Sequence, residues 1–267
     1  MFLYDEGDAS GTLAISQASH AWLAWQVAEH WGNRRFARPA PRPEVLAAIF
    51  THDVGWTEFD ADPGIDDDGR PLTFDRMPAA PHLAIWRASV HRAASFSRYA
   101  GLLVAHHFAA LLEAKIADLL DRGDTTGGRV AEAFRAELER LQVGWREALL
   151  QDARYQPFLD GEPWQVNASV LEACDRISVY LCASLGSPFT VSAWTQDGGE
   201  EAIRFERVGG TRWRVRPWPL EGDRLRAQVE GRRLGRKRFA SAAELQQALS
   251  HAPVERLSFE LVRPSTG

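Results

Sequence analysis

The sequence predicts a mainly α-helical protein with a small antiparallel β-rich subdomain at its C-terminal end. Long segments with apolar residues at helical spacing follow one another as far as Leu185. From Phe189 onward, short runs of alternating apolar and polar residues are separated by glycine-rich turns. With 45% hydrophobic residues, the chain has the composition of a globular protein with a substantial core. We therefore expect a helical domain over residues 1–186 and a β-rich subdomain, packed on it, over residues 187–267.

The first half of the chain is predicted to hold two helices followed by a long loop. The first helix runs from Ser16 to Trp31, with a serine cap and Gly32 at its end. Pro43 suits the first turn of the second helix, which Gly55 ends. Residues Asp60 to Pro81 are rich in Asp, Gly and Pro, which predicts a loop. A structureless segment of this length inside a compact domain is usually functional, so we expect a lid over a site.

The remaining elements follow from periodicity. Four further helices are predicted, at Leu83–Ala94, Tyr99–Leu120, Arg129–Leu150 and Val166–Leu185. The predicted strands are Phe189–Trp194, Ala202–Arg207, Arg212–Val215, Leu225–Glu230, Arg232–Phe239 and, after a helix at Ala242–Leu249, Leu257–Val262.

Composition and charge restrict the partners. The net charge of −5 gives no general attraction to nucleic acid, and the basic run Arg232–Arg238 lies in a predicted hairpin. The N-terminus lacks the pattern of a signal peptide, and no segment approaches about 18 consecutive apolar residues. Cys174 and Cys182 are too far apart on one helix for a disulfide. We expect a cytoplasmic, bacterial protein without a membrane partner, whose association with identical copies stays open.

The segment Thr51-His52-Asp53-Val54-Gly55-Trp56 is the most informative one. It follows an apolar helical run, so His52 and Asp53 are predicted to enter the core. Burying a carboxylate costs several kcal/mol unless it is paired or bound to a cation. A bound metal ion would remove that cost, whereas a simple hydrogen bond between Asp53 and a core histidine is the other interpretation.

Further imidazole and carboxylate groups are spread over separate helices. The candidates for metal ligands are His20, His52, Asp53, His82, His106, His107 and Asp175. Neighbouring residues on a helix diverge by about 100°, so only one of His106 and His107 can easily face a common centre. Mixed imidazole and carboxylate ligands suit divalent Fe, Mn, Ni or Zn, and one or two ions could bind.

These residues, in this order, resemble the HD-domain superfamily of metal-dependent phosphohydrolases. More narrowly, His52-Asp53-Val54-Gly55-Trp56, Trp86, Leu102–Phe108 and Asp175-Arg176-Ile177-Ser178 resemble an uncharacterised bacterial HD-like family over nearly the whole chain. The resemblance implies a helical bundle around a metal centre. It also implies that His20, His52, Asp53 and Asp175 hold a first ion, and that Asp53 bridges to a second one if the intervening histidines are ligands.

The expected activity is metal-dependent hydrolysis of a phosphorylated small molecule, with Asp53, His82 and Trp56 as candidate catalytic residues. Two alternatives stay open. The mixed-valent diiron oxygenases use the same order of ligands to cleave a C–C or C–P bond, and a non-catalytic metal- or ligand-binding module would keep the same residues. In many two-metal members a basic residue stands where this chain has Trp56, which puts substrate binding through that position in question.

The arginines after the first helix are a second candidate. Arg34, Arg35 and Arg38 form a basic group near the proposed site, and guanidinium groups suit phosphate oxygens. The two interpretations are a solvated loop and an anchor for an anionic substrate.

Overall fold

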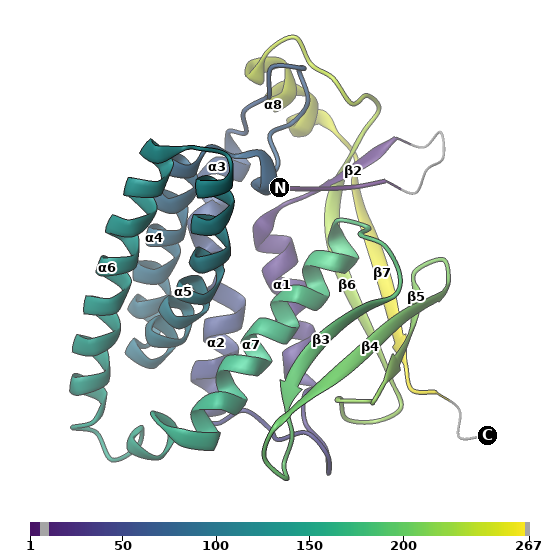
Figure 1. Ribbon diagram of the computed structural model, residues 1–267. Coiled ribbons are helices and arrows are strands. Elements are labelled where there is room, and N and C mark those ends of the chain that lie inside the picture. The colour runs from purple at the N-terminus through teal and green to yellow at the C-terminus, as the bar shows by residue number, and fades with distance from the viewer. Residues whose placement is uncertain (6–10, 265–267) are drawn as a thin grey trace.

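The computed structural model describes residues 1–5 and 11–264. Seven strands form one mixed sheet in the order β1-β2-β6-β7-β5-β4-β3, and the helices α1 to α7 lie beside it (Figure 1). About 53% of the residues are helical, and the half-barrel sheet accounts for 21%. The helices are the majority, as predicted, but the expectation of a small antiparallel subdomain is wrong, because the sheet is a large part of the molecule.

The sheet is larger than predicted because the N-terminus contributes to it. Strands β1 (Phe2–Tyr4) and β2 (Thr12–Ile15) pair with each other, and β2 pairs with β6 (Arg224–Leu234). Runs of three or four residues are too short to show a clear period of two. The sheet is also not purely antiparallel, because β5 (Arg212–Arg216) runs parallel to β7 (Val254–Val262).

The pairing of β2 with β6 explains another difference from the prediction. β6 is one strand where two were expected, and Gly231 lies at the expected break. A Cβ atom at Gly231 would lie 2.6 Å from the Leu13 side chain and 2.9 Å from the Ala14 carbonyl oxygen. The glycine therefore permits the close approach of β2 and does not mark a turn. The other two strands are β3 (Phe189–Trp194) and β4 (Glu200–Gly209).

The predicted helices are present, but α4, α6 and α7 begin four or five residues earlier than the periodicity predicted. The helices of the structure are α1 (Gln17–Glu29), α2 (Arg42–Thr51), α3 (Thr57–Ala61), α4 (Ala79–Phe96), α5 (Arg98–Asp121), α6 (Thr125–Leu149), α7 (Gly161–Cys182) and α8 (Ala242–His251). The Ser16 hydroxyl caps α1 by accepting a hydrogen bond from the Ser19 N–H at 3.1 Å. The Asp124 carboxylate caps α6 in the same way, accepting from the Gly127 N–H at 2.8 Å.

Helices α1 and α7 connect the helical bundle to the sheet (Figure 1). Leu23 of α1 and Ile177 of α7 belong to the same hydrophobic cluster as Phe189 of β3 and Val229 of β6. One core therefore continues across residue 186, where the sequence suggested a domain boundary. This continuity holds α1 and α7 in place, and both carry polar residues of the candidate site.

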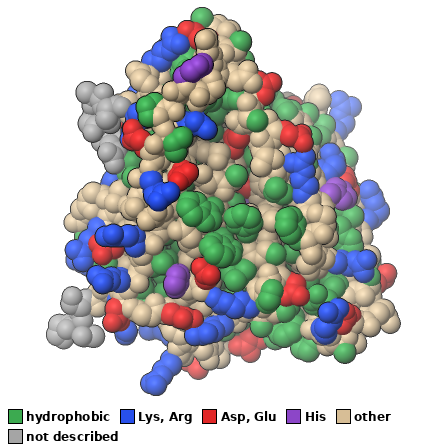
Figure 2. Space-filling view, turned by 180° about the vertical axis from the view of Figure 1, so that it is seen from behind, with side chains coloured by type: hydrophobic (Ala, Val, Ile, Leu, Met, Phe, Trp, Pro, Cys, Tyr) green, Lys and Arg blue, Asp and Glu red, His purple; other side chains and the backbone are tan. Residues whose placement is uncertain are grey.

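The surface carries both signs of charge. On the face opposite to that of Figure 1, a group of hydrophobic side chains lies near the centre, with basic and acidic side chains around it (Figure 2). Among the described helices, only α5 is long and apolar enough by composition to cross a membrane, and 56% of that window is buried inside the protein.

Candidate metal centre

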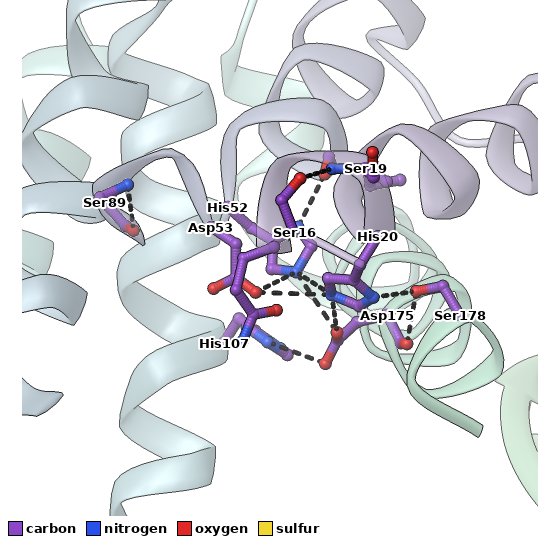
Figure 3. A network of polar contacts seen from close by, with 12 residues as sticks. Ser16, Ser19, His20, His52, Asp53, Ser89, His107, Asp175 and Ser178 are labelled. Carbon is purple, nitrogen blue, oxygen red and sulfur yellow. Dashed lines mark hydrogen bonds and ion pairs between the residues drawn. The ribbon is translucent and has the colours of Figure 1, made fainter. Parts of the chain in front are cut away.

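Four helices bring their polar residues to one point in the helical half (Figure 3). His20 lies in the first turns of α1, His107 in the middle of α5 and Asp175 on α7. His52 caps the C-terminus of α2, and Asp53 follows it. We call these five residues the His/Asp cluster. Both His20 and His52 are almost completely buried, and Asp175 keeps 15% of its side chain exposed.

Gly55 positions the His52-Asp53 segment. Its N–H donates to the Ser89 hydroxyl of α4 at 2.9 Å. A Cβ atom at this position would come within 2.2 Å of the Ile85 carbonyl oxygen. The glycine thus allows the chain after α2 to lie directly on α4, which fixes the place where Asp53 leaves the helix.

The ligand-type atoms of the cluster lie close together. His20 Nε2 is 3.2 Å from His52 Nε2 and 3.1 Å from Asp175 Oδ1, and His52 Nε2 is 3.3 Å from the same oxygen. Asp53 Oδ2 adds a second carboxylate, 3.4 Å from His20 Nε2 and 3.5 Å from His52 Nε2. His107 Nε2 lies 3.4 Å from Asp175 Oδ2.

The partners of the two Nδ1 atoms fix the tautomers of His20 and His52. His52 Nδ1 lies 2.7 Å from the Ile49 carbonyl oxygen, which can only accept, so Nδ1 carries the hydrogen. The Ser178 hydroxyl donates to the Asp175 carbonyl oxygen at 2.8 Å, so it must accept from His20 Nδ1 at 2.7 Å. In the neutral rings both Nε2 atoms therefore present lone pairs to each other. That arrangement needs a positive charge, which a proton or a metal ion supplies.

Burial and the close contacts within the cluster shift the pKa values of His20 and Asp175. Burial lowers the pKa of His20, but hydrogen bonds with Asp175 and Asp53 outweigh it and raise the pKa well above its ordinary value. Burial raises the pKa of Asp175, yet the neighbouring imidazoles of His107, His20 and His52 bring it well below its ordinary value. The cluster thus holds a carboxylate and attracts positive charge to the neighbouring imidazoles.

The spacing of the cluster fits a metal ion. Two ligands at about 2.1 Å from one ion, about 100° apart, lie roughly 3.2 Å from each other. The separations of 3.1–3.3 Å among the ligand atoms of His20, His52 and Asp175 agree with this value, and these three residues form a group that could hold one ion. Asp53 Oδ2 lies 3.4–3.5 Å from both imidazoles but does not belong to that mutually close group. His107 Nε2 is buried without a hydrogen bond, which a further ligand position would explain. The donor set, three imidazoles and two carboxylates, is one that divalent first-row metals accept.

A cavity of about 440 Å³ opens beside the cluster. Much of its lining is apolar, with Trp56, Trp86, Phe108 and Leu111 among the lining residues. Phe74 also lines it, from the segment between α3 and α4 that was predicted to be a lid. A volume of several hundred Å³ is typical of a site for a small organic molecule.

His82 lines the same cavity but belongs to a different environment from the cluster. It lies in the first turn of α4, whereas the sequence placed it in a loop before the helix. Its ring packs against Trp56 and Trp86, with centroids 5.2 Å and 4.7 Å away. Burial, with the charge of Lys115 as a second cause, lowers the pKa of His82 to about 4. His82 is therefore neutral near pH 7.

Several residues proposed from the sequence lie elsewhere. His106 points away from the cluster and packs against Trp164, with ring centroids 5.2 Å apart. Arg34, Arg35 and Arg38 do not line the cavity but a separate surface hollow near Trp218. Arg35 pairs with Glu201 and Arg38 with Glu221. We call Arg34, Arg35 and Arg38 the arginine loop. These side chains lie at the surface and do not line the cavity beside the His/Asp cluster.

Four polar residues of the site were not proposed as site residues from the sequence, although Arg176 and Ser178 stand in a segment that carries the family resemblance. Ser178 orients His20, Lys115 and Arg176 line the cavity, and Gln17 has a buried side-chain oxygen without a hydrogen bond. Lys115 could have been found from helical spacing, because it lies eight residues after His107, close to two turns of a helix.

A comparison with known protein families gives one result. The model of the family described as a protein of unknown function, DUF3891, matches residues 2–236. The chain belongs to this family. The match covers all five residues of the His/Asp cluster and most of the sheet. No curated protein and no solved structure matches the chain.

Proposed function

We propose that this chain is a metal-dependent hydrolase of a phosphorylated small molecule. The observation that carries the proposal is the facing pair of Nε2 atoms of His20 and His52, 3.2 Å apart, with carboxylate oxygens of Asp53 and Asp175 beside both. Buried groups with perturbed pKa values in a cavity are typical of functional sites. The order of these residues along the chain is also the one that resembles the HD-domain superfamily.

In this proposal His20, His52 and Asp175 would hold one divalent ion, and Asp53 would complete the ligand set that the resemblance implies, with His107 nearby. When bound, such an ion would supply Lewis-acid chemistry for hydrolysis of a phosphate ester near neutral pH. The protein contributes orientation: the Ile49 carbonyl oxygen and the Ser178 hydroxyl hold the two imidazoles with Nε2 inward. The aromatic side chains of the cavity exclude water from the ester that is to be cleaved.

The test is metal binding followed by hydrolysis. Purified protein is stripped with a chelator, loaded separately with Mn, Fe, Ni and Zn, and its metal content is measured by mass spectrometry. We expect about one ion per chain and phosphate release from p-nitrophenyl phosphate. His52→Ala should lose both, whereas His91→Ala, an exposed histidine on α4, should keep both.

Two outcomes contradict the proposal. Wild-type protein that binds none of the four metals has no metal centre of this kind. Iron-loaded protein that consumes dioxygen, without phosphate release under any metal, supports the oxygenase alternative over the hydrolase.

A further inference from the structure

Lys115 is a cation inside the cavity, and within the described part of the chain it forms no ion pair with a carboxylate. It projects from α5, is partly buried, and lines the cavity together with the His/Asp cluster. Among the described residues no carboxylate oxygen lies within the 4.0 Å of an ion pair from its ammonium group, and Asp118, the acidic residue one turn further along α5, accepts from Arg122 at 2.8 Å. The charge of Asp118 acts on Lys115 only from a distance, and burial lowers the pKa of Lys115. A partly desolvated ammonium group without a directly paired carboxylate is an attractive place for an anion.

The contact between Lys115 and His82 adds a second hydrogen-bond donor. Lys115 Nζ lies 3.4 Å from His82 Nδ1. An ammonium group can only donate, so Nδ1 accepts and the neutral ring carries its hydrogen on Nε2. In that tautomer His82 offers a donor and has no lone pair on Nε2 for a metal ion. A second cation beside the ammonium group would also be repelled.

The wall next to these donors is aromatic. The rings of Trp56, His82, Trp86 and Phe108 follow one another with centroid separations of 5.2, 4.7 and 4.8 Å, and Trp86 and Phe108 are stacked. Phe108 in turn contacts the ring of His107, at the metal centre, at 5.6 Å. Substrate hydroxyl groups against this wall would lose their hydrogen bonds to water without replacement, whereas an apolar group would gain from burial.

We propose that the substrate is a phosphate monoester with an apolar organic group, aryl or alkyl, and that Lys115 binds its phosphate. The proposal rests on the proposed function and names the substrate class. The phosphate lies between the His/Asp cluster and the ammonium group of Lys115, and the organic group lies against Trp86 and Phe108. Sugar phosphates and nucleotides are disfavoured, because the described aromatic wall gives their hydroxyl groups few partners.

The experiment measures binding of phosphonates, which cannot be hydrolysed, to the full-length metal-loaded chain by calorimetry. Phenylphosphonate and methylphosphonate are the two phosphonate probes. Ribose 5-phosphate, a phosphate ester rich in hydroxyl groups, is the comparison, and release of inorganic phosphate from it is measured alongside. Burial of the phenyl ring should make phenylphosphonate bind at least about tenfold more tightly than the other two. Lys115→Met should weaken the affinity for phenylphosphonate by about 10- to 100-fold, because a charge-assisted hydrogen bond to the ligand is lost. Lys115→Arg should stay within about tenfold of wild type.

The matched control is Lys237→Met, because Lys237 is the only other lysine and is exposed, where it pairs with Asp5. It should bind phenylphosphonate like the wild type. Metal content and melting temperature of each variant show that the fold and the metal centre are intact. Wild-type affinity in a folded, metal-loaded Lys115→Met protein overturns the role of Lys115. Equal affinity for methylphosphonate or ribose 5-phosphate overturns the apolar substrate class.

These results are separable from a failure of the proposed function. Phenylphosphonate binding needs no turnover, so it tests Lys115 even if no ester is hydrolysed. Conversely, hydrolysis of p-nitrophenyl phosphate with unchanged KM in Lys115→Met would support the hydrolase and contradict the inference. The absence of any phosphonate binding to metal-loaded wild-type protein also contradicts it.

Discussion

The His/Asp cluster and the arginine loop are two groups of charged residues that the sequence offered as functional, and the structure treats them in opposite ways. In the cluster, buried atoms of five residues converge until imidazole nitrogens and carboxylate oxygens are 3.1–3.5 Å apart. In the loop, Arg35 and Arg38 are 58% and 62% exposed, and each already pairs with its own glutamate. The comparison teaches that charge alone does not indicate a site. A functional site is indicated where buried polar groups cannot complete one another's hydrogen bonds or balance one another's charge.

The largest expected effect separates a buried charge from an exposed one. Asp175→Asn removes the carboxylate that three imidazoles share, so metal-free protein should lose about 3 kcal/mol of unfolding free energy, the cost of breaking a buried pair. Glu201→Gln breaks the exposed pair with Arg35 and should cost at most about 1 kcal/mol. Urea denaturation at pH 6 in a chelator measures both. Equal losses would remove the distinction between the two regions.

Ser178→Ala tests the orientation of His20 without removing any ligand. The change takes away the acceptor for His20 Nδ1, so a buried donor is left unpaired. We expect a loss of about 1–3 kcal/mol in stability and an about 10- to 100-fold weaker affinity for metal. Ser95→Ala is the control, because Ser95 is an exposed serine on α4 that donates to the carbonyl oxygen three residues earlier. An unchanged metal affinity in Ser178→Ala would contradict this role.

The pH dependence of stability gives a third test, on metal-free protein. His20 has a raised pKa in the folded state, so its contribution is complete below its unfolded value of 6.5 and is lost as the pH rises through the folded value. Asp175 has a lowered pKa, so its contribution is complete above 3.8 and is lost as the pH falls through the folded value. We expect the highest melting temperature between these two values. A metal ion needs deprotonated imidazoles and should move the optimum upward, and a melting temperature that rises steadily to pH 9 without metal would contradict this account.

The smallest effect is expected in the arginine loop. Arg35→Ala removes an exposed ion pair and should change the unfolding free energy by less than about 1 kcal/mol. Metal content and phenylphosphonate affinity should equal those of the wild type, because Arg35 does not line the cavity. A tenfold loss of phosphonate affinity in this variant would place the arginine loop back in the binding site.

The sequence by itself determined the helices and most of the residues of the His/Asp cluster. Helical periodicity, the serine cap of the first helix and Pro43 are local signals, and tertiary packing does not change them because each acts within one or two turns. The sequence alone shows a histidine and an aspartate at the end of an apolar helix. The energetic cost of burying that carboxylate predicted a bound cation or a polar partner. The spacing of about 100° between neighbours also showed that His106 and His107 could not both face inward.

Only the tertiary structure decided the rest. Ile15 pairs with Gly231, more than 200 residues away, and no periodicity within a four-residue strand can predict such a partner. The way α5 packs against its neighbouring helices decides which of its faces lines the cavity. That face carries His107 and Lys115, whereas His106 packs against Trp164. The same packing left the arginine loop in solvent with its own glutamates. Long-range packing determines which polar groups are buried away from water. Burial of several charged groups together is what distinguishes the His/Asp cluster from the arginine loop.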